Sequence, residues 1–530
     1  MHLIPKTILI LFGLFLLVGQ RPSDLKGEET LPNIIYIWID TLRADGLGFY
    51  GNERELSPNL DQLAEESIVF MNQHTPHTVT LSSFSSIITG LYPFSHGVLN
   101  ISKDKLPIQV KTFAQVLKMH GYQTSWFGPL EDPHLDPEVG FGWGFDKIDE
   151  FDSNFGLAFG TDKILQEIER LKDQRFFINF HTYFVHAPYI PSEEYRFAFT
   201  EKKDYGVIES WEGIEAATVR NIKQAIETED GMAYWILEKE LADEMREADL
   251  FTDDYRTSAR KIQDYLLERN LFHRYNNIFS LSYQNSIDQS NPEVLEYVRA
   301  LYDATVLEFD QEVIGPLVER LKEMGLYDKT MIIVCSDHGE EFGEHGELGH
   351  GRSLYQEVTH VPFFFKPAGD HVHQKIYERS QTVDIMPTIL DLIGIRIPHQ
   401  IDGQGKNFAP LIRNEAGFEP RKYLYGQMNY HESISSDDWK LHIFRGYHEL
   451  PWFGEAINIA IFGKRELFNV KNDPTEQINL LKKQQLVGKS LTKELREWKD
   501  SLRRFQTEVY EFQPNIDEQT KDRIKKTGYW

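Results

Sequence analysis

NIIYIWID, residues 33–40, is the stretch that decides the fold, and the rest of the chain can be interpreted outward from it. Its apolar side chains follow one another without a break, and turn-forming residues stand at both ends. An apolar run of this length predicts a strand that is buried on both faces, as in the middle of a parallel sheet.

Three similar runs follow along the chain, with helical patterns between them. The runs are FFINF ending at Phe180, MIIVCS ending at Ser336, and VPFFF beginning at Val361. A helix start is predicted where Ser57 and Pro58 precede NLDQLAEESI, as N-cap and first-turn proline. Strands that alternate with helices predict an α/β fold with a mainly parallel central sheet sandwiched by helices.

Two segments depart from this alternation. Residues of about 200–295 are charged and helix-forming, which predicts an inserted helical subdomain, either a lid over the site or surface decoration. From about Lys422, short segments indicate a small antiparallel sheet, followed by a charged helix near Leu491–Phe505. We therefore predict a main domain over residues 32–415 and a C-terminal α+β subdomain and tail over residues 416–530.

The N-terminus, MHLIPKTILILFGLFLLVGQ, has an apolar run from Thr7 to Gly19 behind a lysine. This run is short for a membrane span, which needs about 20 residues, and is typical of a signal-peptide core. We expect residues 1–20 to be a signal peptide or short anchor and 21–31 to be a linker. The protein is then exported, periplasmic or secreted; an uncleaved anchor and a buried helix are the alternatives.

Composition limits the class of partner. The formal net charge of −26 argues against nucleic acid, and against an anionic membrane surface, as the main partner. A hydrophobic content of 41% over 530 residues allows a large interior, which excludes global disorder. Cys335 is the only cysteine, so neither an intramolecular disulfide nor a cysteine metal cluster can form.

Polar side chains stand where the predicted strands end. Asp40 and Thr41 follow the first strand, His181 follows the second, and Asp337 and His338 follow the third. Ligand sites in such sheets gather at the carboxyl ends of the strands. One such residue alone is most simply a capping or turn residue, but three coincidences favour a shared site.

Two carboxylates and an imidazole, from Asp40, Asp337 and His338, suit a divalent cation of intermediate hardness such as Zn²⁺ or Mn²⁺. Three ligands leave an open position, where a hydroxyl would lose its proton more readily. Candidates lie in the hydroxyl-rich segment 78–89, whose helical periodicity closes at Gly90. The amino end of such a helix favours a bound tetrahedral anion.

Histidines cluster near the same strand ends. HTYFVHAPY contains His181 and His186, and GEHGELGHGRSLY contains His345 and His350. An imidazolium can hold the oxygens of a transferring group or protonate its leaving oxygen. Alternatively, some of these side chains only satisfy loop hydrogen bonds, which suits His345 best and His186 and His350 least.

Motifs along nearly the whole chain, apart from the predicted insertion, resemble the sulfatase family within the alkaline-phosphatase superfamily. The resemblance implies an alkaline-phosphatase-like fold and a hydrolase acting on ester bonds. The matching segments, in the order of the family, are NIIYIWIDTLRADGLGFYG, SPNLDQLAEESIVF, TLSSFSSIITGLYPFSHGV, FFINFHTYFVHAPYIPSEEY, LYDATVLEFDQEV, TMIIVCSDHGEEFGEHGELGHGRSLYQE, VDIMPTILDLIG and RELFNVKNDPTEQINL.

The resemblance also implies roles for individual residues. The nucleophile of the family lies ten residues before the glycine of the TGLYP segment, which selects Thr80 here. His350 stands where relatives place a lysine or histidine facing the transferred group, and His186 resembles the other anion-contacting histidine. We thus expect the metal ligands Asp40, Thr80, Asp337 and His338, the catalytic residues Thr80, His186 and His350, and the substrate-binding residues His181 and Arg352.

This chain departs from the family pattern at several positions. Threonine at position 80 replaces the cysteine or serine that is oxidised to formylglycine, and Thr41 replaces a second aspartate ligand. Phe84, Ser82 and Pro129 replace an arginine, a proline and a lysine. The remaining ligands resemble the single-metal set of phosphoethanolamine transferases and lipoteichoic-acid synthases. We expect one divalent ion, Zn or Mn over Ca or Mg, and a DTLRAD branch with a threonine nucleophile.

A threonine at position 80 also limits which kind of ester the protein can hydrolyse. A formylglycine hydrate releases sulfate by collapsing to an aldehyde, whereas a threonine sulfate has no such exit. A threonine phosphate can be cleared by attack of water or an alcohol at phosphorus. We therefore predict hydrolysis of phosphomonoesters, phosphodiesters or phosphonates, built on a small molecule, sugar or lipid head group. The alternatives are sulfuric ester hydrolysis without formylglycine, and phospho-head-group transfer on a lipid or glycan.

Overall fold

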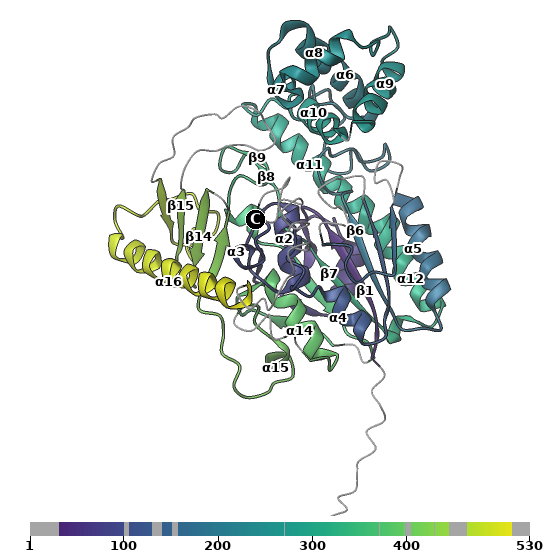
Figure 1. The fold of residues 1–530 in the computed structure, drawn as a ribbon. Coiled ribbons are helices and arrows are strands. Elements are labelled where there is room, and N and C mark those ends of the chain that lie inside the picture. Colours follow the sequence, from purple (N-terminus) through teal and green to yellow (C-terminus); the bar gives the residue numbers. More distant parts are fainter. Residues whose placement is uncertain are drawn as a thin grey trace, which may run out of the picture.

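Figure 1 shows the fold of the chain in the computed structural model. The predicted signal or anchor segment 1–20 and nearly all of the predicted linker 21–31 lie outside the described residues. No helix within the described part of the chain combines the length and the apolar character that a membrane span requires. The described residues are 31–99, 105–129, 140–150, 157–269, 271–369, 372–396, 398, 404–428, 430–444 and 464–510.

The segment NIIYIWI forms β1 (Asn33–Ile39) at the centre of an eight-stranded sheet. β1 pairs in parallel with β6 (Phe176–Thr182) on one side and β7 (Thr330–Cys335) on the other, and all three are buried. The predicted mainly parallel sheet is confirmed. The sheet order is β11 (Gln374–Ile376), β2 (Ile68–Phe70), β10 (Phe363–Lys366), β7, β1, β6, β4 (Gln123–Gly128) and β5 (Lys147–Glu150).

The run VPFFF forms β10, which departs from the mainly parallel direction of the sheet. β10 runs antiparallel to both neighbours, β7 and β2. The chain between β7 and β10 stays at the carboxyl end of β7, where it forms the small hairpin of β8 (Glu341–Phe342) and β9 (Leu348–Gly349) and the short helix α13 (Gln356–Thr359). Because no crossover returns the chain to the other end of the sheet, the next strand runs back.

Successive side chains of β1 belong alternately to two hydrophobic clusters, one on each face of the sheet. Ile35, Ile37 and Ile39 join a cluster with side chains of α1 (Pro58–Glu65), α5 (Leu157–Leu171), α11 (Pro292–Phe309) and α12 (Gly315–Glu323). Ile34, Tyr36 and Trp38 join a second cluster with side chains of α2 (Thr80–Thr89), α4 (Phe113–Met119) and α14 (Ile385–Leu392). Since successive strand residues face opposite sides, helices cover both faces, as predicted.

The helical insertion stands apart from these layers. Figure 1 shows its helices beyond one end of α11, away from the central sheet. They share a hydrophobic cluster of their own, separate from the two clusters on the sheet. The helices are α6 (Trp211–Thr228), α7 (Met232–Leu237), α8 (Lys239–Glu247), α9 (Tyr255–Leu267) and α10 (Phe272–Gln284).

A C-terminal antiparallel sheet is present, as predicted. Its strands follow one another in sequence order, as β13 (Leu424–Gln427), β14 (His431–Ser435), β15 (Lys440–Phe444) and β16 (Arg465–Phe468). The C-terminal helix α16 (Gln485–Tyr510) begins before the predicted Leu491 and covers this sheet with Leu491 and Leu495. Shorter elements are β3 (Gln73–His74), which pairs with β12 (Ser380–Gln381), α3 (Pro93–His96) and α15 (Ala409–Ile412).

β14 was not predicted, because its sequence HESIS is mostly polar. One of its side chains, His431, belongs to what we call the C-terminal polar cluster, a buried set formed by His431, Lys440, His442 and Glu476. His431 Nε2 lies 2.9 Å from His442 Nδ1, and His442 Nε2 lies 3.1 Å from Glu476 Oε2. Lys440 Nζ lies 2.7 Å from Glu476 Oε1, so the polar groups pair with one another.

Candidate active site

Three candidate ligands meet at the carboxyl ends of β1 and β7. Asp40 directly follows β1, and Asp337 and His338 follow β7 after one residue. Because these two parallel strands are neighbours, the side chains converge, and one ligand atom of each lies within 4.8 Å of the others. All three side chains are fully buried. We call these residues the ligand cluster.

Gly339 and a hydrogen bond to its carbonyl fix the imidazole of His338 in the ligand cluster. At Gly339 a Cβ atom would lie 2.1 Å from the carbonyl oxygen of Glu357, so only glycine allows this close approach. His338 Nδ1 donates to the Gly339 carbonyl at 3.0 Å, because a carbonyl can only accept. Nε2 is therefore the nitrogen left for the cluster, 3.3 Å from Asp337 Oδ2.

The charge balance of the ligand cluster fits a bound cation. Burial raises the pKa of Asp337, and burial lowers the pKa of His338 to about 4, which keeps the imidazole neutral near pH 7. Among the described residues, none hydrogen-bonds to Asp337 Oδ2. Two buried carboxylates beside a neutral imidazole are unfavourable without a positive charge, and this donor set suits a divalent metal.

Thr80 is the first residue of α2, and its hydroxyl reaches the ligand cluster. Thr80 Oγ1 lies 3.3 Å from His338 Nε2, within hydrogen-bond range. Ser83, one turn further, donates its hydroxyl to the Asp337 carbonyl at 2.6 Å. This bond ties the amino end of α2 to the end of β7, so the helix holds Thr80 in place.

Other hydroxyls of the same segment are bonded elsewhere. Thr78 Oγ1 donates to the Ser353 carbonyl at 2.9 Å. Ser85, Ser86 and Thr89 donate to carbonyl groups four residues earlier. These bonds direct the hydroxyls away from the ligand cluster and distinguish Thr80 from its neighbours.

His181 lies beside Asp40 of the ligand cluster. Its Nε2 is 3.3 Å from Asp40 Oδ2, and its fully buried ring stacks on Trp38 with centroids 3.7 Å apart. Phe84 stacks on the other side of Trp38, also at 3.7 Å, and so replaces the arginine of the family pattern with part of an aromatic stack. His181 therefore holds Asp40 in place, and substrate contact by His181 stays a prediction.

His186 and His350 lie next to each other, close to His338 of the ligand cluster. Their ring centroids are 4.9 Å apart, and the His350 ring is 4.3 Å from that of His338. Burial, followed by the positive charge of Arg352, lowers the pKa of His350 to about 3. Arg352 donates to Glu347 at 2.8 Å. The structure thus brings both histidines to the site, and their catalytic roles stay predictions.

Thr41 occupies the place of the missing second aspartate without joining the ligand cluster. Its backbone is left-handed, with φ at 58°, which is uncommon for a β-branched residue. Its hydroxyl donates to the Val185 carbonyl at 3.2 Å, and its carbonyl accepts from the Tyr302 hydroxyl at 3.1 Å. The Thr41 amide is 3.4 Å from Asp337 Oδ1, so the main chain supports a ligand here.

Glu340 was missed at the sequence level, although it completes the DHGE motif. Its side chain is fully buried beside the ligand cluster and contacts His350. The spacing of ten residues gives no helical or strand relation between the two, so only the fold brings them together.

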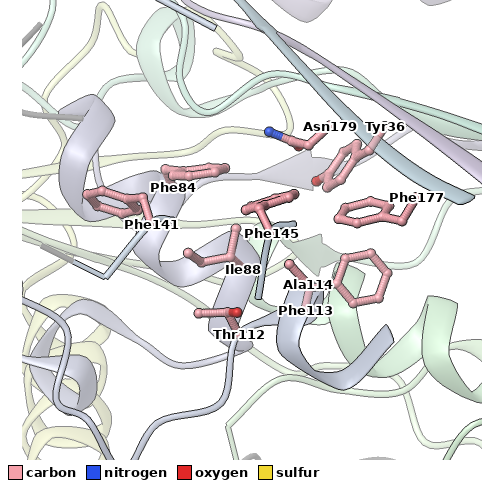
Figure 2. A pocket seen from close by; sticks show the side chains of 10 residues that line it. All are labelled: Tyr36, Phe84, Ile88, Thr112, Phe113, Ala114, Phe141, Phe145, Phe177 and Asn179. Carbon is pink, nitrogen blue, oxygen red and sulfur yellow. The ribbon is translucent and has the colours of Figure 1, made fainter. Parts of the chain in front are cut away.

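Figure 2 shows a small cavity next to the aromatic stack. Its volume of about 10 Å³ is that of one water at most. None of the candidate catalytic side chains lines it, so it cannot be the substrate pocket. The lining includes Tyr36, Phe84, Phe141, Phe177 and Asn179.

Comparisons with known proteins agree with this geometry. The profile of the Sulfatase family matches residues 32–395, which is more than half of the chain. A second profile, described as N-sulphoglucosamine sulphohydrolase, C-terminal, matches residues 343–503. The two matches together run from β1 to the C-terminal helix.

Relatives of known function are similar over most of their length. An N-acetylglucosamine-6-O-sulfatase of Bacteroides thetaiotaomicron is 26% identical over 94% of this chain and 92% of that protein. An arylsulfatase of Clostridium perfringens is 25% identical over 85% of this chain and 90% of that protein. PehA of Trinickia caryophylli, a multifunctional alkaline phosphatase superfamily protein, is 23% identical over 85% and 91%.

Solved structures share the fold. A phosphonate monoester hydrolase of Agrobacterium radiobacter superposes with a TM-score of 0.63 at 18% identity, covering 90% of this chain and 96% of that one. A protein in complex with its substrate D-glucosamine-2-N,6-O-disulfate gives 0.61 at 21% identity, covering 89% and 98%. With the family match over residues 32–395, these similarities show that the chain belongs to the sulfatase family of ester hydrolases, in the alkaline-phosphatase superfamily.

Proposed function

We propose that this chain is a metal-dependent hydrolase that cleaves the ester of a tetrahedral oxoanion, using Thr80 as its nucleophile. The observation that carries the proposal is the 3.3 Å distance between Thr80 Oγ1 and His338 Nε2, at the amino end of α2. A hydroxyl in this place can enter the coordination shell that the ligand cluster provides. The amino end of the helix favours the anionic group.

Asp40, Asp337 and His338 would hold one divalent cation, with Thr80 as a further ligand. The imidazole favours Zn²⁺ or Mn²⁺ over Ca²⁺ or Mg²⁺, which prefer oxygen ligands alone. When bound, the cation supplies positive charge that lowers the pKa of a coordinated hydroxyl.

In the proposed reaction, Thr80 Oγ1 attacks the sulfur or phosphorus atom of the ester. A bond forms from Thr80 to that atom, and the bond to the leaving oxygen breaks. The proton that Thr80 loses passes to His350 Nε2, which gives it to the leaving oxygen, while His186 holds the oxygens of the transferred group. Water then attacks the same central atom and releases Thr80 with the free oxoanion.

Sulfate esters are the first substrate class to test. The similarity to an N-acetylglucosamine-6-O-sulfatase and to an arylsulfatase supports this class, and it supports a sugar or aryl group on the leaving oxygen. These similarities favour the sulfuric ester alternative over the phosphate-ester prediction. Because Thr80 cannot become formylglycine, the sulfated threonine must be cleared by direct attack of water at sulfur.

Phosphate-type esters are the second candidate, and Thr80 is the observation that favours them. A phosphorylated threonine is cleared by in-line attack at phosphorus, which needs no aldehyde. The structural similarity to a phosphonate monoester hydrolase shows that the same fold carries such chemistry elsewhere. The two classes differ in the group transferred, so one panel of esters separates them.

The test is a panel of aryl sulfate, phosphate, phosphonate and phosphodiester substrates, together with 6-O-sulfated N-acetylglucosamine. We expect turnover of at least one class, its loss in Thr80→Ala, and retention of most of the metal in that variant by elemental analysis. Thr78→Ala is the matched control, because its hydroxyl is bonded to Ser353 instead. Unchanged turnover in Thr80→Ala removes Thr80 as nucleophile. Transfer to an added alcohol without free oxoanion indicates the transferase alternative.

A further inference from the structure

We propose that Glu340 is a positioning residue that fixes the ring of His350, so that Nε2 of this ring is presented to the leaving oxygen. Glu340 Oε1 lies 2.8 Å from His350 Nδ1, and the glutamate side chain is fully buried. The inference rests on the proposed function, because it assigns how one of the proposed catalytic groups is held.

The hydrogen bond selects one tautomer of His350. When Glu340 is ionised, its carboxylate can only accept a hydrogen bond, so the proton sits on Nδ1. Nε2, on the opposite side of the ring, is then bare in the resting state, so it can take up the proton that Thr80 loses and pass it to the leaving oxygen. A carboxylate behind an imidazole also stabilises the positive charge that develops when the other nitrogen holds a proton.

The second oxygen of Glu340 is held as firmly as the first. Tyr189 donates its hydroxyl to Glu340 Oε2 at 2.7 Å. Tyr189 is itself buried against the rings of Tyr302 and Phe342, with centroids 5.6 and 5.7 Å away. Because both oxygens are bonded, the carboxylate cannot turn away from His350.

Glu340 thereby joins two segments that carry candidate catalytic residues. Tyr189 belongs to the HAPY segment that begins with His186, whereas His350 follows the hairpin of β8 and β9. Glu340 bridges the two segments, and the histidine rings lie 4.9 Å apart. A purely structural tie between loops would also need these bonds, so the test must report on His350 itself.

The first measurement is the leaving-group dependence of kcat/KM in Glu340→Gln. Proton donation matters most for poor leaving groups, so we expect about a 100-fold loss on an alkyl ester and only a few-fold loss on the 4-nitrophenyl ester. KM should change little. Glu341→Gln is the matched control, because Glu341 is an equally buried neighbour that accepts from Ser353. Equal losses of Glu340→Gln on both esters would overturn the proposal.

The second measurement is a double-mutant cycle with His350. In a His350→Gln background, Glu340→Gln should cause no further loss on the alkyl ester, because its effect passes through the missing imidazole. A loss of the same size in both backgrounds assigns Glu340 to the support of the fold alone, and contradicts the proposal.

The third measurement needs no turnover. In protein labelled with ¹⁵N-histidine, the His350 signals, identified by their loss in His350→Gln, should show the proton on Nδ1. A proton on Nε2 with a bare Nδ1 overturns the positioning role. If the chain turns over none of the esters, the proposed function fails, and this measurement still decides the role of Glu340.

Discussion

The ligand cluster and the C-terminal polar cluster are both buried sets of carboxylates and imidazoles, yet their charges are balanced differently. In the C-terminal cluster, Glu476 is paired with Lys440 at 2.7 Å and with His442 at 3.1 Å. In the ligand cluster, Asp337 Oδ2 accepts no hydrogen bond from the described residues, and the imidazole of His338, 3.3 Å away, is neutral.

This difference separates a structural role from a binding role. Burying charge is unfavourable unless an opposite charge is buried with it. The C-terminal cluster contains its own cation in Lys440 and needs nothing more. The ligand cluster lacks one among its own members, which is what a site for a metal ion requires. Substitutions in the two clusters should therefore affect different properties.

The largest effect is expected for Thr80→Ala, beside the ligand cluster. Loss of the nucleophile should lower kcat by about 10⁴-fold, since removal of a catalytic nucleophile commonly has effects of this size. Thermal unfolding should change little, because His338 is the only hydrogen-bond partner of the Thr80 hydroxyl within the described part of the chain. If Thr80→Ala lowered the stability but not the turnover, the binding role assigned to the ligand cluster would be contradicted.

Removal of metal should destabilise the protein through the ligand cluster alone. If one ion binds and its free concentration is about 1,000 times its Kd, chelation lowers the free energy of unfolding by about 4 kcal/mol. Asp337→Asn should abolish this response to chelator, as measured by thermal unfolding with and without EDTA. Glu476→Gln should retain it. A wild-type chain that is insensitive to chelator and free of metal refutes the metal site.

Glu476→Ala should be strongly destabilising, because it leaves Lys440 buried without its partner. Breaking such a buried pair costs about 3–5 kcal/mol, measurable by urea unfolding of the metal-free protein. Asp337→Asn, measured in the same way, should be neutral or stabilising, because it removes a buried carboxylate that lacks a counter-charge. The opposite ranking would mean that the two clusters are balanced alike.

Glu341 belongs to neither cluster, and its burial should make the stability of the protein depend on pH. Burial raises the pKa of Glu341 from its usual 4.5 to about 8. The native state then holds more protons than the unfolded chain between these values, so stability is full below pH 4.5 and is lost as pH rises through 8. The slope is about 1.4 kcal/mol per pH unit in this window. Glu341→Gln should flatten this slope, measured by urea unfolding across the pH range. An unchanged slope would mean that other groups cause the pH dependence of stability.

The ligand cluster could be predicted from the sequence, because strand ends follow from apolar runs and parallel neighbours bring their ends together. Asp40, Asp337 and His338 needed only that rule. Thr80 needed the family resemblance, since a row of hydroxyls does not reveal which one a helix directs inward. The bond from Ser83 to the Asp337 carbonyl, which makes that choice, joins residues far apart in the chain.

Other features of the fold and the site depend on tertiary structure and could not be predicted from the sequence. The direction of β10 is set by where the preceding loop returns, not by its own residues. In β14, His431 joins the C-terminal polar cluster and Glu432 pairs with Lys499, so the sequence of this strand gives no apolar alternation. β4, from QTSWFG, mixes polar and aromatic residues in the same way and was not predicted. The role proposed for Glu340 depends on a contact across the hairpin of β8 and β9.

The left-handed backbone at Thr41 has a consequence for stability. Aspartate, asparagine and glycine adopt this conformation more readily than threonine, so Thr41→Asp would relieve the main chain while adding a carboxylate beside Asp40. The backbone preference and the charge balance of the ligand cluster therefore act in opposite directions at this position.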